Sequence, residues 1–196
     1  MADIVQAIGG MNELTTLCLE TCWEIEYIID ETTPHEDAFV PRLDELVLID
    51  MHFLKQLWCG PPPFSLFQKL KRLTIFDCSQ LLNIFPEANC NLGNLKFLTI
   101  SKCSMLTSLF PVSAACTLLS LMKLQIEDAP QLKFVFGENA SEEQLMHDQD
   151  EIQIELCHLE YLELLDLPNL VGICSGRYCP RWPSIKEINW RNCPNL

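Results

Sequence analysis

The sequence predicts an α/β repeat solenoid with a parallel β-sheet on its concave face and an irregular, turn-rich convex side. One pattern of apolar residues returns along the chain at intervals of about 25 to 29 residues, with one interval longer by about a dozen. In addition, 48% of the 196 residues are apolar and only 7 are glycine, so a large core can be buried. Units of this period are predicted to start near residues 14, 43, 70, 95, 121, 159 and 185.

Within each unit, apolar residues occupy positions 1, 4, 6, 9, 12 and 15. In the unit that starts at Leu70, positions 4 and 6 are Leu73 and Ile75, which are two residues apart and therefore point inward from one short strand. The later steps of three favour a chain that winds back through turns or short helical pieces. One such coil cannot bury its apolar edge alone, whereas a stack of coils can.

Two further positions predict ladders of buried side chains along the stack. Position 9 is small or apolar in every unit: Cys22, Met51, Cys78, Cys103, Ala129, Leu167 and Cys193. Position 16 is aromatic in four units: Trp58, Phe85, Phe110 and Phe136. Cysteine behaves as a small apolar residue in cores, and stacked rings fill wide spaces. We therefore expect both ladders to be structural.

The repeat, with cysteine at position 9, resembles the leucine-rich repeat. Segments such as LTIFDCSQL at residues 73–81, and a proline two residues before a unit starts (Pro41, Pro183), resemble the irregular C-terminal repeats of plant intracellular nucleotide-binding leucine-rich-repeat disease-resistance proteins of the coiled-coil type. The resemblance runs from Leu14 to Leu196 and implies a horseshoe-shaped solenoid. The phosphate-binding motif G-x-x-x-x-G-K-[ST] does not occur, so we expect a single array over 1–196 with no nucleotide-binding domain. ATP or ADP would bind only a missing upstream domain.

The longest unit contains an acidic segment, predicted to be an insertion loop over 137–156. Residues 138–155 carry seven carboxylates and no lysine or arginine, which favours a solvated loop at the edge of a solenoid. A contact for a basic partner is the functional alternative. The alternation of Ile152, Ile154 and Leu156 predicts that the chain returns as a short strand.

Charge and segment composition exclude several classes of function. Thirteen basic and 27 acidic side chains give a formal charge of −14, which opposes binding to nucleic acid. No apolar stretch approaches the roughly 20 residues that cross a bilayer, and the N-terminus lacks the pattern of a signal peptide. We therefore expect a cytoplasmic protein with reduced thiols.

Candidate catalytic and metal-binding groups are weak, so we expect neither an enzyme nor a metal or cofactor site. Cys157 and His158 are adjacent, and neighbours on an extended chain do not face one another. Cys174, Cys179 and Cys193 lack the paired C-x-x-C spacing of structural zinc sites. Zinc found in stoichiometric amount would revive an enzyme hypothesis.

The remaining hypothesis is protein recognition through the strands. Positions 3, 5 and 7 alternate with the buried positions and should point outward on the concave face. Aromatic residues and arginine on such a face are typical of protein contacts, although an ordinary exposed strand face is the alternative. The predicted contact residues are Arg72, Thr74, Phe76, Phe97, Thr99, Ser101, Lys123, Gln125, Glu127, Tyr161 and Glu163.

The resemblance implies three kinds of partner: a pathogen effector, a guarded host protein, or the receptor's own nucleotide-binding region. A free-standing adaptor that recruits substrates, for example to a ubiquitin ligase, is an alternative function, and so is a decoy fragment. Because neither end shows a polar capping unit, we also expect self-association through exposed edges.

Overall fold

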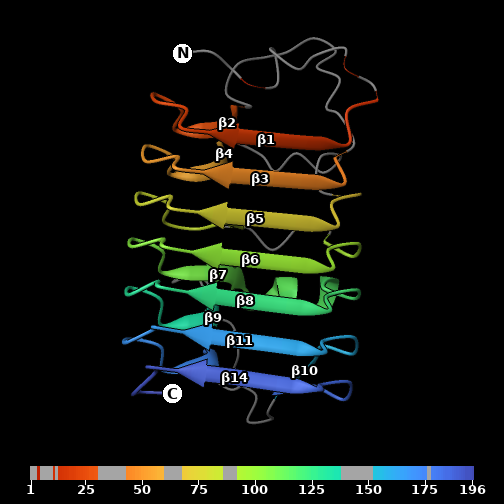
Figure 1. Cartoon of the computed structure of the whole chain (residues 1–196). Coiled ribbons are helices and arrows are strands. Elements are labelled where there is room, and N and C mark those ends of the chain that lie inside the picture. Colours follow the sequence, from red (N-terminus) through yellow and green to blue (C-terminus); the bar gives the residue numbers. More distant parts are fainter. Residues whose placement is uncertain are drawn as a thin grey trace.

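The computed structural model describes residues 4, 11, 13–30, 43–59, 68–85, 92–137, 152–175 and 178–196. Seven five-residue strands form one parallel sheet, here called the main sheet, in which each strand pairs with the next along the stack (Figure 1). Each strand begins two residues after one of the predicted unit starts. The strands are β1 (Thr16–Glu20), β3 (Glu45–Ile49), β5 (Arg72–Phe76), β6 (Phe97–Ser101), β8 (Lys123–Glu127), β11 (Tyr161–Leu165) and β14 (Glu187–Arg191).

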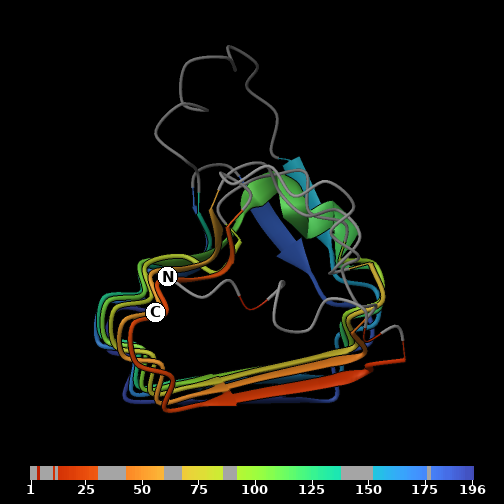
Figure 2. The same ribbon diagram turned by 90° about the horizontal axis from the view of Figure 1, so that it is seen from above.

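Shorter elements occupy the side of the stack opposite the main sheet, as Figure 2 shows in a view down the stack. They form three small parallel sheets beside one 3-10 helix, η1 (Val112–Thr117). The predicted solenoid with a parallel sheet and an irregular second side is confirmed. The strands of the small sheets are β2 (Tyr27–Asp30) with β4 (Gln56–Cys59), β7 (Ser108–Pro111) with β9 (Phe134–Gly137) and β12 (Gly172–Cys174), and β10 (Ile152–Glu155) with β13 (Tyr178–Arg181).

Backbone hydrogen bonds hold successive coils in one register. Before the strands, the amide of Lys71 donates to the carbonyl of Asp44 (2.8 Å), and the amide of Lys96 donates to the carbonyl of Lys71 (2.8 Å). Beyond the strands, the amide of Asp50 donates to the carbonyl of Phe76 (3.0 Å). A slip by one residue would turn the apolar side chains outward, so the buried pattern fixes this register.

The residue that follows each main-sheet strand has a left-handed backbone. Its φ lies between 51° and 57° in all seven coils, and four of the seven are aspartate and one is asparagine. Short polar side chains tolerate this conformation better than other non-glycine residues. The turn therefore favours aspartate or asparagine at this edge of the main sheet. The seven residues are Thr21, Asp50, Asp77, Lys102, Asp128, Asp166 and Asn192.

The core lies between the main sheet and the small sheets. It contains the whole aromatic ladder and five of the seven position-9 residues, while Cys22 and Cys193 at the two ends are only partly buried. The rings of Phe85 and Phe110 stack at 5.1 Å and 3°, those of Phe110 and Phe136 stack at 5.4 Å and 20°, and Trp58 lies 6.0 Å from Phe85. All four side chains are at most 1% exposed. Such offset aromatic contacts add to the free energy of burial, so the ladder ties neighbouring coils together.

The thiols of the position-9 ladder occupy the bend where the chain leaves the main sheet. Cys78 and Cys103 are completely buried, and their Sγ atoms donate to the carbonyls of Phe76 (3.7 Å) and Ser101 (3.6 Å), two residues earlier. Burial, the largest cause, raises the pKa of Cys78 from 9.0 to about 12 and that of Cys103 to about 11. These thiols are therefore protonated core groups and poor nucleophiles.

The segment predicted as an acidic insertion loop (137–156) is described only at its ends. Gly137 closes β9, and residues 138–151 lie outside the described part of the chain. The short strand expected at the return is confirmed as β10, which pairs in parallel with β13. The pairing brings the chain back onto the small-sheet side before the next main-sheet strand.

The C-terminal coil exposes apolar side chains that its counterparts bury. Ile188 and Trp190 occupy the two inward-pointing positions of β14 and are 39% and 56% exposed, whereas Leu98 and Ile100 at the same positions of β6 are completely buried. No described coil covers this face of β14. An exposed apolar surface of this kind favours association.

The first prediction concerns stability at alkaline pH. Below pH 9 both thiols are protonated in the folded and unfolded states, so their contribution to stability is fully present. As the pH rises above 9, both thiols ionise in the unfolded chain while they stay protonated in the folded one. The free energy of unfolding should therefore fall by about 1 kcal/mol per pH unit for each thiol, up to about pH 11 for Cys103 and about pH 12 for Cys78. Urea denaturation across this pH range should show a fall in the free energy of unfolding that is smaller in the C78A/C103A variant than in the parent chain.

The control for this prediction is the variant C18A/C157A, which removes two exposed thiols instead. It should lose stability with pH as steeply as the parent chain. Equal slopes for C78A/C103A and the parent would show that the buried thiols make no pH-dependent contribution. The lysine and tyrosine titrations are common to all three proteins and do not affect the comparison.

The second prediction is that the isolated chain self-associates through the C-terminal coil. Light scattering should give a mass above 22.5 kDa that falls to this value on dilution, and I188E/W190E should be monomeric at all concentrations. The control variant L119E changes an apolar residue that is 61% exposed elsewhere and should behave as the parent does. A parent chain that is monomeric at every concentration would contradict this expectation.

Candidate protein-interaction surface

The outer face of the main sheet is the side predicted to be concave, and its residues fall into three rows. The strand register places Arg72, Phe97, Lys123 and Tyr161 side by side at position 3. Position 5 aligns Thr74, Thr99, Gln125 and Glu163, and position 7 aligns Phe76, Ser101 and Glu127. The structure thus brings all eleven predicted contact residues together on four adjacent strands.

These residues differ in how much surface they offer. Phe76 and Tyr161 are 37% and 39% exposed, large values for aromatic side chains of a folded domain. Ser101 is only 9% exposed, because its short side chain stands in register between Phe76 and Glu127. It can contribute little to a contact. The other eight residues are half-buried or exposed.

Cations and rings pair on this face. The guanidinium carbon of Arg72 lies 4.5 Å from the centre of the Phe97 ring, and Nε of Arg72 is 3.3 Å from Oε1 of Glu45. The ammonium of Lys102 lies 4.8 Å from the centre of the Phe76 ring. These contacts hold flexible side chains in place, which lowers the entropy lost when a partner binds.

Lys102 is a surface residue that sequence reasoning missed. It belongs to the left-handed turn after β6, one residue beyond the alternating strand positions, so strand periodicity gives no information about its direction. Only the packing of neighbouring coils brings its ammonium over Phe76.

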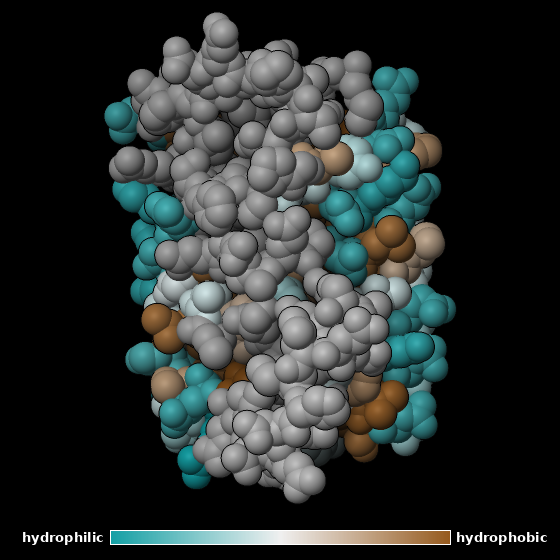
Figure 3. Space-filling model, turned by 180° about the vertical axis from the view of Figure 1, so that it is seen from behind, coloured by the Kyte–Doolittle hydropathy of each residue, from teal (hydrophilic) through white to brown (hydrophobic). Residues whose placement is uncertain are grey.

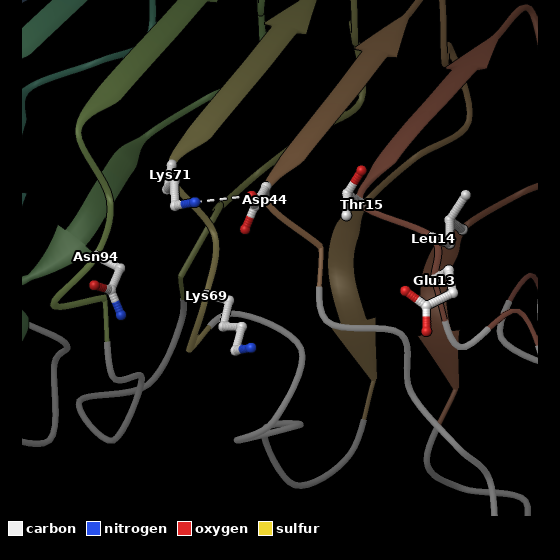
Figure 4. A pocket seen from close by; sticks show the side chains of 7 residues that line it. All are labelled: Glu13, Leu14, Thr15, Asp44, Lys69, Lys71 and Asn94. Carbon is white, nitrogen blue, oxygen red and sulfur yellow. Dashed lines mark hydrogen bonds and ion pairs between the residues drawn. The ribbon is translucent and has the colours of Figure 1, made fainter.

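Shallow hollows border the outer face at the edge where the strands begin. The larger has a volume of about 560 Å³, and Figure 4 shows Asp44 and Lys71 facing each other in it, with Nζ and Oδ2 at 2.8 Å. A second hollow of about 430 Å³ lies between Glu45, Arg72 and Phe97. Both are open and rich in charged groups, unlike the deep apolar clefts that hold small molecules. The larger is lined by Glu13, Leu14, Thr15, Asp44, Lys69, Lys71 and Asn94.

The small-sheet side of the stack differs from the outer face of the main sheet. Figure 3 shows it from behind, and hydrophilic side chains predominate on the described flanks, with scattered apolar residues between them.

An aromatic cluster lies at the edge where the strands end. The centre of the Trp23 ring is 6.1 Å from that of the His52 ring and 6.4 Å from that of the Phe53 ring.

The weak catalytic and metal candidates do not form a site among the described residues. Cys157 and His158 are exposed in the turn after β10. Sγ of Cys193 lies 3.4 Å from the carbonyl oxygen of Arg191 and 3.5 Å from that of Leu164, so its single S–H is directed at the backbone, while the side chain of Cys179 lies outside the described part. Within the described ranges, no three His, Cys, Asp or Glu side chains gather as metal ligands would, and no helix is long and apolar enough to cross a membrane.

Comparison with known proteins identifies the repeat. The model of the family described as plant disease resistance protein RPS2-like, leucine-rich repeats, matches residues 3–91 and 87–196. No curated protein and no solved structure gave a match. The matched ranges cover nearly the whole chain and include all seven main-sheet strands. The chain therefore belongs to the leucine-rich-repeat family of RPS2-like plant disease resistance proteins.

Proposed function

We propose that this chain is a non-catalytic, cytoplasmic recognition module of a plant innate immune receptor, which binds another protein through the outer face of its main sheet. The observation that carries the proposal is the array of exposed aromatic and cationic side chains around Arg72, Phe76 and Phe97. These side chains are on the face that the coils do not need for their own packing. Membership of a disease-resistance family supports the biological role.

The chemistry of this face suits a protein ligand. Aromatic rings and arginine supply large contact areas and directional hydrogen bonds, and such residues carry most of the binding energy in protein interfaces. Contacts with Phe97 and Glu45 already hold the Arg72 side chain in place, so it loses little conformational entropy when a partner binds. A pathogen effector, a guarded host protein and the receptor's own nucleotide-binding region are all candidate partners of this kind. The module itself needs no cofactor in this proposal.

An adaptor that recruits substrates to a ubiquitin ligase is the second candidate function. It would use the same outer face but would also have to hold a ligase subunit. Capture of ligase subunits together with other proteins would favour it over the receptor module.

The third prediction tests the outer face with the variant R72A/F76A/F97A. Captured proteins from plant leaf extract, quantified by mass spectrometry, should fall about tenfold or more relative to the parent chain, because three contact side chains are lost together. The free energy of unfolding in urea should change by no more than about 1 kcal/mol, since none of the three side chains is fully buried.

The matched control is M105A/L119A/K133A, which also removes two apolar side chains and one cation, all of them exposed away from the main-sheet strands. It should capture the same proteins as the parent chain. If the outer-face variant keeps all of the parent's partners, or if both variants lose them equally, the proposed recognition surface is wrong.

A further inference from the structure

Basic side chains are concentrated at one place on this acidic protein. Five of its 13 lysines and arginines are at the edge where β5, β6 and β8 begin, although the chain carries 27 carboxylates and a net charge of −14. These five residues, here called the basic strip, are Lys69, Lys71, Arg72, Lys96 and Lys123.

The opposite edge of the same sheet is acidic, and the fold explains why. Asp50, Asp77, Asp128 and Asp166 occupy the left-handed turn after their strands, a conformation that favours short polar side chains. Lys71, Arg72, Lys96 and Lys123 stand in or beside extended strands, where the backbone accepts almost any residue. The fold accounts for the acidic edge but not for the basic one.

Ion pairs within the protein also leave much of the strip's charge uncompensated. Lys71 pairs with Asp44 (2.8 Å) and Arg72 with Glu45 (3.3 Å), but the two cationic side chains are 52% and 48% exposed, so these pairs contribute little to stability. Lys69, Lys96 and Lys123 form no ion pair with a described residue. Lys96 follows Lys71 directly in the ladder, with its amide donating to the Lys71 carbonyl at 2.8 Å. The ammonium groups of Lys71 and Lys96 therefore repel each other, which raises the free energy of the protein when no partner is bound.

The basic strip also lines the two hollows at this edge. Lys69 and Lys71 reach into the hollow of about 560 Å³, as Figure 4 shows, and Lys71, Arg72 and Lys96 border the hollow of about 430 Å³. Carboxylates line both hollows as well, but the second has three cations (Lys71, Arg72 and Lys96) against Asp44 and Glu45, so it gives a short anionic side chain a place to enter.

We propose that the basic strip docks an acidic segment of a protein partner, with aspartate or glutamate side chains entering the hollows beside Lys71 and Lys96. This inference rests on the proposed recognition function and names the chemistry and orientation of the ligand. The acidic side of the partner lies over the starts of β5, β6 and β8, and its apolar contacts lie over Phe76 at the end of β5 and over Tyr161 at the start of β11.

A protein segment fits the strip better than a nucleic acid. Glu13, Asp44 and Glu45 are interspersed among the cations, and a continuous run of phosphates would have to pass these carboxylates. Separate carboxylates on a peptide can be placed to avoid them.

The fourth prediction is tested by fluorescence anisotropy on the purified chain with a labelled peptide of about ten residues, half of them glutamate, which spans roughly 30 Å when extended. The parent chain should bind it with an affinity that falls as salt is added. The variant K69E/K96E should bind roughly tenfold or more weakly, because charge reversal adds repulsion to the lost attraction.

The matched control K55E/K133E makes the same change in net charge at lysines that precede the small-sheet strands β4 and β9, and it should bind the peptide within about twofold of the parent. Equal binding by the two variants, or no binding by the parent, would overturn the inference. So would a single-stranded oligonucleotide of the same charge that binds more tightly than the peptide and loses affinity in K69E/K96E.

Failure here is distinguishable from failure of the proposed function. Neither K69E nor K96E belongs to the outer-face variant R72A/F76A/F97A. If that variant loses its captured proteins while the glutamate peptide fails to bind, the recognition surface stands and only the acidic nature of its ligand is wrong.

Discussion

The interaction on which this structure depends is the stacking of one coil on the next. A single coil has no interior, and Leu98 or Ile100 becomes completely buried only because coils lie on both sides of it. Hydrogen bonds between main-sheet strands fix the register of the coils. Deeper in the core, the rings of Phe85, Phe110 and Phe136 from successive coils stack in the same order. At β14, where no described coil follows, the same strand positions are exposed.

Stacking separates the residues that build the protein from those that can bind. Positions 4 and 6 of each strand point inward and hold the coils together, while positions 3, 5 and 7 point outward with their backbone groups already paired. The outer face can therefore vary in chemistry at little cost to the fold. In this chain it carries aromatic rings on its middle strands, the basic strip where β5, β6 and β8 begin, and an acidic edge where the strands end.

Much of this arrangement could be predicted from the sequence, because a repeating pattern states which residues are equivalent. The seven main-sheet strands, the buried Cys78 and Cys103 and the aromatic ladder all follow from that equivalence. The pattern does not give contacts between neighbouring coils, which depend on side-chain length and turn geometry. The burial of Ser101, the position of Lys102 over Phe76 and the hollows beside Lys71 became visible only in three dimensions.

Hydrogen exchange of the main-sheet amides tests most directly whether contacts between coils hold the fold and leave the outer face free. We expect protection to be greatest in β5, β6 and β8, which have at least two main-sheet strands on each side, and to fall toward β1 and β14. Protection should follow a strand's place in the stack and not the chemistry of its outer side chains. Equal protection in all seven strands, or the strongest protection at β14, would contradict a fold held by stacking.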